Sequence, residues 1–372
     1  MLALCPSRIL TPSGFKTGRC LLIENGLIAD VVPLKNCPSP EFLEGDLVPG
    51  FIDLQVNGGG GVLLNDEPTI KGIEEIGRAH RAFGTTGFLP TLISDDLDFI
   101  DRAMRAVEAA IEAGIPGVLG IHVEGPFINV EKRGIHDAGK IRRIDDAAVE
   151  LLGSLMTGIT LVTLAPELDP PGMIEKLRER RVTVAAGHTA ASYEDTRDAL
   201  RSGVSGFTHL FNAMTQLSAR APGAVGAALE SDAWCGIIAD GFHVHPAALR
   251  VALRAKGPDK LVLVTDAMPT VGSGRTTFTL GGRTIHVDNG RIAADDGTLA
   301  GSNLNMAAAV ANAVQMLEVD LATAVRMASL NPARAIGVDE TTGEIRPDLR
   351  ADLALLDAEG RVVRTWIAGA PN

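Results

Sequence analysis

The sequence predicts an α/β protein, a (β/α)8 TIM-like barrel with a small β-sandwich domain formed from both termini. Short apolar runs alternate with helical periodicity through most of the 372 residues. Repeated strand–helix units are typical of a parallel sheet, and eight of them before a terminal helix indicate closure into a barrel. Apolar residues make up 46% of the chain, enough for a large core. Periodicity alone leaves an open doubly wound sheet as the alternative.

The two ends of the chain have the pattern of strands in one small β domain. Segments 19–24 and 26–32 flank the pair Asn25-Gly26, which is a strong hairpin signal. Segments 351–357 and 361–367 near the C-terminus have the same character. We therefore expect the small domain to comprise residues 1–48 and 336–372, with the barrel in residues 49–335.

Eight apolar runs between the ends are candidates for the barrel strands. They are 47–56, 87–93, 118–123, 160–165, 182–186, 205–210, 234–239 and 260–265. Helical periodicity is clear in 70–83, 97–113 and 192–202, and it resumes after residue 303. The stretch 275–299 has a β and turn pattern, so we expect a β insertion near the mouth of the barrel.

Charge and cysteine usage limit the classes of partner and compartment. The net charge of −12 disfavours nucleic acid and anionic membranes as partners, although a few local cations could still hold one phosphate. The apolar runs are too short for a membrane helix or a signal peptide. The four cysteines, Cys5, Cys20, Cys37 and Cys235, show no CxxC spacing. We expect four reduced thiols in a cytoplasmic protein.

Polar residues follow four of the apolar runs at equivalent places. They are Glu124, His188, His209 and Asp266. Barrel enzymes carry catalytic groups at the C-terminal ends of their strands, so these side chains should converge at one rim. Two histidines and one carboxylate leave an open position for water on a divalent metal, and Asp266 would accept that water's proton. A lone histidine more often caps a turn or fills a core, but four matched positions favour the metal site.

Three further histidines and one arginine have less certain roles. His122 lies in the third run, where a structural role is favoured over support of a metal. His136 follows that run in a loop, where it could polarise a substrate carbonyl or remain solvated. Arg220 and His243 are candidate phosphate contacts, with a plain surface role as the alternative.

Several blocks of the sequence, in the same order along the chain, resemble one family. The segment PGFIDLQVNG at 49–58 resembles the first-strand signature of the amidohydrolase superfamily. The later blocks look like those of its N-acetylglucosamine-6-phosphate deacetylase family. They are HVEGPF at 122–127, AGHT at 186–189, THLFNAM at 208–214, ADGFH at 239–243, VTDA at 264–267, GTLAGS at 297–302 and NPARA at 331–335. The resemblance implies a carbon–nitrogen hydrolase acting on a linear amide, in amino-sugar catabolism or cell-wall recycling.

The resemblance also implies a role for each matching residue. Glu124, His188 and His209 match the metal ligands, Asp266 the catalytic acid/base, and His136 a group that polarises the acetyl carbonyl. The implied substrate contacts are Ile135, His136, Asn212, Ala213, Arg220, His243, Leu299, Ala300 and Gly301. The family implies a homodimer in which Arg220 and His243 complete the neighbouring subunit's site.

The metal count follows from the first block. Many amidohydrolases carry His-x-His there, but this chain has Gln55 and Asn57, and neutral amides are poor ligands for a zinc-like ion. We expect one divalent ion per subunit, zinc by preference, with iron(II) or another divalent ion as the alternative. A weak second ion near Gln55 and Asn57 remains open.

The alternatives in function are an N-acetylgalactosamine-6-phosphate deacetylase, another amidohydrolase, or a non-catalytic sugar-phosphate binding protein. The binding protein is disfavoured because all three metal ligands and the acid/base are present.

Overall fold

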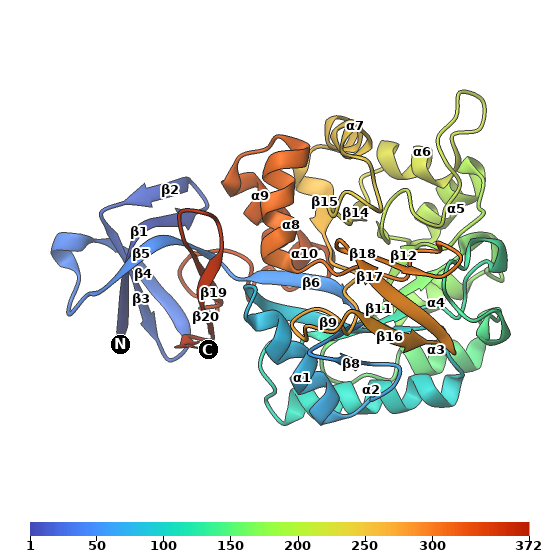
Figure 1. Cartoon of the computed structure of the whole chain (residues 1–372), viewed down its shortest axis with the longest axis horizontal. Coiled ribbons are helices and arrows are strands. Elements are labelled where there is room, and N and C mark those ends of the chain that lie inside the picture. Colours follow the sequence, from blue (N-terminus) through green and yellow to red (C-terminus); the bar gives the residue numbers. More distant parts are fainter. Residues whose placement is uncertain (372) are drawn as a thin grey trace.

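The computed structural model describes residues 1–371 and consists of a barrel and a smaller β domain that holds both chain termini (Figure 1). The chain begins in the small domain, passes into the barrel through consecutive strands, and returns to the small domain at its end. The predicted fold class is confirmed. The domain boundaries at residues 48 and 336 remain a prediction.

Eight parallel strands form the barrel, and each overlaps one of the eight apolar runs. In chain order they are β6 (Phe51–Val56), β9 (Thr85–Ile93), β10 (Gly120–Glu124), β11 (Ile159–Leu164), β12 (Thr183–Ala186), β13 (Gly206–Phe207), β14 (Trp234–Ile237) and β15 (Leu261–Leu263). They are hydrogen-bonded in that order. A parallel bridge between Val56 and Ala267 joins the first strand to the segment after the last, and Asp266 N donates to Gln55 O at 2.9 Å. These contacts at the seam bring the two edges of the sheet together.

Helices follow the strands, as the periodicity predicts. They are α1 (Ile70–Arg81), α2 (Leu97–Glu112), α3 (Asp146–Leu152), α4 (Met173–Glu179), α5 (Tyr193–Ser202), α6 (Gly223–Glu230), α7 (Pro246–Lys256), α8 (Met306–Asn312), α9 (Leu321–Ala328) and α10 (Leu330–Ala335). Local sequence fixes where some of them begin. The side chain of Thr69 caps α1, and Ser192 forms a capping box with Asp195 at the start of α5.

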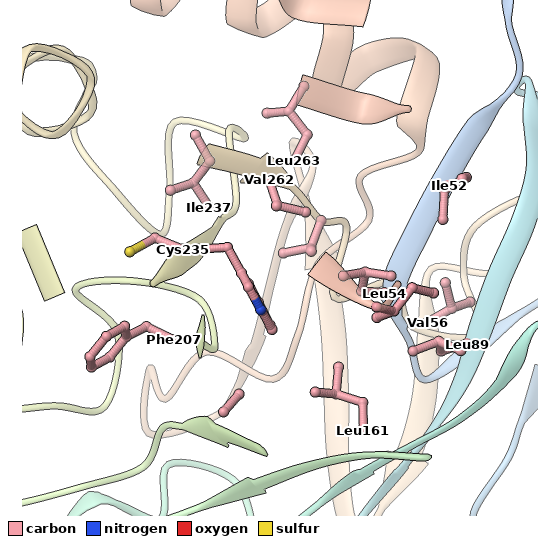
Figure 2. Packing of buried hydrophobic residues seen from close by; sticks show 14 of the residues in the cluster. Ile52, Leu54, Val56, Leu89, Leu161, Phe207, Cys235, Ile237, Val262 and Leu263 are labelled. Atoms are coloured by element: carbon pink, nitrogen blue, oxygen red, sulfur yellow. The ribbon is translucent and has the colours of Figure 1, made fainter. Parts of the chain in front are cut away.

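The core of the barrel consists of apolar side chains contributed by strands far apart in the sequence. Figure 2 shows Leu54 and Val56 of β6 in one cluster with Leu161 of β11 and Val262 of β15. All four side chains are buried. Strands covered on both faces need apolar residues at successive positions, which explains the unbroken apolar runs.

The small β domain is one continuous sheet that curls over its own core. Its strands are β1 (Leu2–Thr11), β2 (Gly14–Thr17), β3 (Arg19–Glu24), β4 (Leu27–Pro33), β5 (Glu41–Pro49), β19 (Leu353–Leu356), β20 (Val362–Ile367) and β21 (Ala370–Pro371). The core includes Leu4, Leu47 and Trp366. The predicted hairpin joins β3 to β4, with Asn25 and Gly26 at φ values of 52° and 80°. Both termini therefore contribute to one hydrophobic core.

The β insertion is a three-stranded antiparallel sheet after the last barrel strand. It comprises β16 (Thr277–Leu280), β17 (Arg283–Asp288) and β18 (Arg291–Ala294). Its buried face packs on Leu63, Ile93 and Met268. Leu63 belongs to a two-stranded ribbon, β7 (Gly58–Gly59) with β8 (Val62–Leu63), which follows the first barrel strand. The insertion thus covers part of the rim where the strands end.

The first apolar run needs a correction, because residues 47–56 contain parts of two strands. Leu47–Pro49 end β5 in the small sheet, while the barrel strand begins at Phe51. Gly50 lies between them, and a Cβ there would lie 2.1 Å from Oγ1 of Thr86. Pro49 and Gly50 therefore mark the passage from one sheet to the other inside a single hydrophobic stretch.

The expectation of four reduced thiols is also wrong for this structure, which joins Cys5 and Cys20 by a disulfide. The two residues lie on the antiparallel pair β1 and β3, where Leu4 pairs with Leu21. The next step of that register places Cys5 directly opposite Cys20. Cys37 and Cys235 are free thiols. Among residues 1–371, no helix is both long and apolar enough to cross a membrane.

Candidate active site

The four polar residues singled out by their positions after strands do meet at one rim of the barrel. Glu124 is the last residue of β10, and His188 and His209 each follow the end of their strand by two residues. Asp266 follows β15 by three. The group is almost fully withdrawn from solvent. The exposed fractions are 2% for Glu124, 6% for His188, 4% for His209 and 9% for Asp266.

Glu124, His188 and His209 direct one atom each at a common point. Oε1 of Glu124 lies 3.3 Å from Nε2 of His188 and 3.0 Å from Nε2 of His209, and the two nitrogens are 3.0 Å apart. Ligands at about 2.0–2.1 Å around one tetrahedral ion are separated by roughly 3.3 Å. The spacing therefore fits a single small cation.

Hydrogen bonding fixes which ring nitrogen of His188 is available to a metal. Nδ1 of His188 lies 2.8 Å from the carbonyl oxygen of Lys132, which only accepts, so Nδ1 carries the proton. In the neutral ring Nε2 then keeps its lone pair, as a metal ligand requires. Within residues 1–371 nothing hydrogen-bonds to the buried Nδ1 of His209. This donor set fits a divalent ion.

His136 lies close enough to be considered as a fourth ligand, but its hydrogen bonds argue against it. Potential ligand atoms of Glu124, His136 and His188 all lie within 4.8 Å of one another. However, both Oγ of Ser94 (2.7 Å) and its backbone N–H (3.4 Å) contact Nδ1 of His136. A backbone N–H only donates, so Nδ1 accepts and Nε2 carries the proton. Burial lowers the pKa of His136 to about 3, and its neutral ring therefore offers an N–H donor to the cavity.

Asp266 is held by the two amides that replace the usual histidines of the first strand. Its Oδ1 accepts from Nδ2 of Asn57 at 2.6 Å and from Nε2 of Gln55 at 3.2 Å. The same Gln55 nitrogen donates to Glu124 at 2.9 Å. These N–H groups occupy the space between the two carboxylates, which supports the expectation of one ion. The sequence identifies Gln55 and Asn57 only as residues that replace metal-ligating histidines, and it does not reveal their hydrogen bonds to Asp266.

The two carboxylates of the site have opposite pKa shifts. Burial and the neighbouring charge of Glu124 raise the pKa of Asp266 to about 7. Burial also acts to raise the pKa of Glu124, but hydrogen bonds from His188 and His209 outweigh it and hold that pKa well below its usual value. Glu124 is thus the permanent anion, and Asp266 is the group suited to exchange a proton near neutral pH.

His243 also has a fixed orientation. Its Nδ1 lies 2.7 Å from Oδ2 of Asp240, the residue three positions earlier. Burial acts to lower the pKa of His243, but the hydrogen bond and charge of Asp240 outweigh it and raise the pKa. His243 is therefore a buried ring with raised basicity, as an anion-binding role requires.

These residues surround a cavity of about 370 Å³, a size typical of small-molecule sites. The predicted residues that line it are Glu124, Ile135, His136, His188, His209, Asn212, Ala213, His243, Asp266, Leu299 and Gly301. Ala300 is buried behind this lining, and Arg220 is exposed in a loop outside the cavity. His243 lines the cavity of its own chain, and its service to a neighbouring subunit stays a prediction.

Lys132 lines the same cavity and was not singled out from the sequence. Among the cavity residues that the structure describes it is the only lysine or arginine, and within residues 1–371 it has no ion-pair partner. By contrast, the nearby Lys140 is paired with Asp95 and Asp96. The sequence signal for Lys132 is the segment KRGIH at 132–136, which places a cation four residues before His136.

Several of these residues have backbone torsions that are uncommon for side-chain-bearing residues. His188, His209, Ala213 and Asp266 have φ values of 48°, 32°, 51° and 54°. Such left-handed conformations cost roughly 1–3 kcal/mol each and cluster at functional sites. The turns at the strand ends thus direct the side chains inward at some expense of stability.

Comparison with known proteins agrees with this geometry. The family model for the amidohydrolase family matches residues 47–371. The chain belongs to the amidohydrolase family. Among the relatives of this amidohydrolase is the N-acetylgalactosamine-6-phosphate deacetylase of Shewanella sp. strain ANA-3, 43% identical over 89% of this chain and 84% of the relative.

Solved structures also resemble this amidohydrolase over its whole length. The N-acetylglucosamine-6-phosphate deacetylase of Pasteurella multocida is 34% identical, with a TM-score of 0.96 over 100% of this chain and 99% of that one. An aspartate-to-alanine mutant of the Mycobacterium smegmatis deacetylase, solved in complex with N-acetyl-D-glucosamine-6-phosphate, is 30% identical. Its TM-score is 0.90 over 100% of this chain and 98% of that one.

Proposed function

We propose that this amidohydrolase removes the acetyl group of N-acetylglucosamine 6-phosphate, giving glucosamine 6-phosphate and acetate. The convergence of Glu124, His188 and His209 on one point, with Asp266 beside them, is the observation that carries the proposal. Relatives and solved structures with this name support the choice of substrate. Because a charged sugar phosphate crosses a bilayer poorly, we place the reaction in the cytoplasm.

The three converging residues would hold one divalent ion, with zinc as our first choice. Bound there, such an ion supplies Lewis acidity, which polarises the amide carbonyl and makes a bound water more acidic. Glu124 contributes a negative charge to the ion, and His188 and His209 contribute neutral nitrogens. Iron(II) and other divalent ions accept the same ligands.

Two side chains of the chain would carry the proton and charge movements. Asp266 accepts the proton of the attacking water, which adds its oxygen to the acetyl carbon. His136 donates its Nε2–H to the carbonyl oxygen as negative charge develops there. Asp266 then passes the proton to the amine nitrogen, the carbon–nitrogen bond breaks, and acetate and the amino sugar leave.

Acetate release from N-acetylglucosamine 6-phosphate by the metal-loaded protein tests this function. Turnover of that substrate and weak turnover of unphosphorylated N-acetylglucosamine are the expected results. Binding of the phosphosugar without acetate release would instead indicate a non-catalytic binding protein.

The galactosamine epimer is a second candidate substrate. The Shewanella relative named for it is 43% identical, compared with 38% for the human relative named for the glucosamine epimer. The two sugars differ only in the orientation of one hydroxyl group, so a single hydrogen bond could discriminate between them. The ratio of kcat/KM for the two phosphosugars decides between the candidates.

A homodimer is part of the proposal because Arg220 lies outside the cavity of its own chain. An exposed arginine on a loop can reach the neighbouring subunit's site, where its forked donors suit phosphate. Leu217 in the same loop is also exposed, as a contact residue would be in an isolated chain. We therefore assign Arg220 to the partner's cavity.

The pH dependence of turnover is expected to report on Asp266. Only its deprotonated form accepts a proton, so kcat/KM should fall as pH drops through the pKa of Asp266. The hydrogen bond from Asn57 lowers that pKa, because it stabilises the charged form. Asn57→Ala should therefore move the acid limb of the pH–rate profile to higher pH. An acid limb that stays in place, or moves to lower pH, would contradict this assignment.

Lys132→Ala is expected to weaken binding of the phosphorylated substrate selectively. A charge-assisted hydrogen bond contributes about 1.5–3 kcal/mol, which corresponds to roughly a 10- to 100-fold rise in KM. The KM for the unphosphorylated sugar should change little. Lys140→Ala is the matched control, since that lysine is already neutralised by Asp95 and Asp96. Equal effects on both sugars would show that Lys132 does not bind the phosphate.

A further inference from the structure

Three of the four cysteines lie together in the small β domain, away from the barrel site. Cys5 lies on β1 and Cys20 on β3, and Cys37 follows the short 3-10 helix Leu34–Asn36 that precedes β5. Their sulfur atoms all lie within 4.8 Å of one another. Cys5 is 5% and Cys20 0% exposed, whereas Cys37 is half-buried. Three sulfurs from three separate segments thus converge on one partly accessible point.

We propose that Cys5, Cys20 and Cys37 form a binding site for a metal ion that prefers sulfur ligands, such as Zn²⁺. The structure shows the oxidised form of this thiol cluster, with Cys5 and Cys20 joined by a disulfide. The reduced form offers three thiolates, the ligands that zinc and copper(I) favour. The cluster therefore has two mutually exclusive states. In the oxidised state Cys5 and Cys20 form a disulfide, and in the reduced state the three thiolates can bind a metal ion.

The spacing of the sulfurs supports the reduced, metal-binding state. Sulfurs bound to one tetrahedral zinc at about 2.3 Å are separated by roughly 3.8 Å. Sγ of Cys37 already lies 3.5 Å from Sγ of Cys5, although no bond joins them. After reduction, Cys5 and Cys20 need only side-chain rotations to separate their sulfurs to this distance. The ion would reach the cluster from the side of Cys37, the half-buried member.

The composition of the cluster distinguishes it from the catalytic site. In the part of the chain that the structure describes, no histidine, aspartate, glutamate or fourth cysteine joins the three sulfurs, so solvent would complete the coordination. The three converging residues of the barrel site offer one carboxylate and two imidazoles. An ion at the thiol cluster would tie β1 and β3 to the segment before β5, which stabilises a small domain with a limited core.

The two states interconvert by a balanced reaction. A thiol or phosphine reductant supplies two electrons, and two protons are taken up as the bond between Cys5 and Cys20 breaks into two thiols. Binding of one Zn²⁺ then displaces the protons of three thiols. An oxidising disulfide or peroxide reverses the change and releases the ion. The metal content of the small domain is thus expected to follow the thiol redox state.

The test is a titration of the full-length, pre-reduced protein with Co²⁺ as the probe, without oxygen. Thiolate bound to Co²⁺ gives an intense near-ultraviolet charge-transfer band, whereas carboxylate and imidazole ligands do not. We expect the band in the reduced protein and its loss in the oxidised protein. Cys37→Ser should lose the band and bind one ion fewer per chain. Cys20→Ser is a second variant with the same expected result, in case the first folds poorly.

Cys235→Ala provides the matched control, because Cys235 is buried in the barrel on β14 (Figure 2). This variant should keep the band and the ion count of the unmodified chain. A missing band in the reduced protein, or a band that survives both Cys37→Ser and Cys20→Ser, would overturn the proposal. The deacetylase assay is independent of this result, since Cys5, Cys20 and Cys37 lie outside the catalytic cavity.

Discussion

Asp266→Asn is expected to lower deacetylase turnover by about 10²- to 10⁴-fold, the range for loss of a general acid/base. The amide cannot accept the proton of the attacking water, yet it has nearly the same shape as the carboxylate. Its oxygen can still accept the hydrogen bonds from Asn57 and Gln55, so the surrounding geometry should persist. Turnover at saturating substrate, measured beside the metal content of the same preparation, gives the result.

The metal content distinguishes a lost proton acceptor from a damaged site. Glu124, His188 and His209 are unchanged in this variant, so it should retain as much metal as the parent protein. Asp295→Asn, directly after β18 of the insertion, is a control that should leave turnover unchanged, since its side chain is 84% exposed and, within residues 1–371, forms an ion pair with His286 alone. Turnover of Asp266→Asn within tenfold of the parent value would assign the proton transfer to another group.

His209→Ala is expected to abolish tight metal binding and, with it, activity at limiting metal. Removing a residue that only orients a metal ligand typically weakens metal affinity 10- to 100-fold. Removing one of the three ligands themselves should therefore weaken metal affinity by more than ~100-fold. A chelator should inactivate the parent protein in the same way, and added Zn²⁺ should restore it. The variant should not recover at that Zn²⁺ concentration. Metal analysis after dialysis and a reactivation titration measure both effects.

The control for this variant is His286→Ala, because His286 is half-exposed on β17 and far from the converging ligands in sequence and sheet. It should bind metal and turn over substrate like the parent protein. If His209→Ala kept its metal through dialysis, His136 would be the next candidate for the third ligand, as the other nitrogen near Glu124 and His188.

The eight barrel strands could be predicted from the sequence because both of their faces are buried. Runs such as 118–123 and 182–186 overlap β10 and β12 closely, because an unbroken series of apolar residues is typical of a strand buried on both faces. The ends of strands were less predictable: the run 205–210 yields only the two-residue strand β13. The division at Gly50 was missed because hydrophobicity continues across it while the chain changes sheets.

The site was predictable where a side chain follows a strand directly and unpredictable where its role depends on a distant partner. Glu124, His188, His209 and Asp266 were identified by position alone. The contacts of Gln55 and Asn57 with Asp266 span more than 200 residues, so no local pattern could reveal them. The pairing of Ser94 with His136 becomes visible only after folding. The same holds for Lys132, which lines the cavity and has no ion-pair partner among residues 1–371.

The seam between β6 and the segment after β15 has a consequence for how activity appears during folding. Gln55 and Asn57 come from the first barrel strand, whereas Asp266 comes after the last. A growing or refolding chain cannot orient its proton acceptor until these distant stretches dock, and long-range docking of this kind is slow. During refolding, turnover should therefore return later than the helical circular dichroism signal. Catalytic activity would then indicate that the last stage of folding is complete.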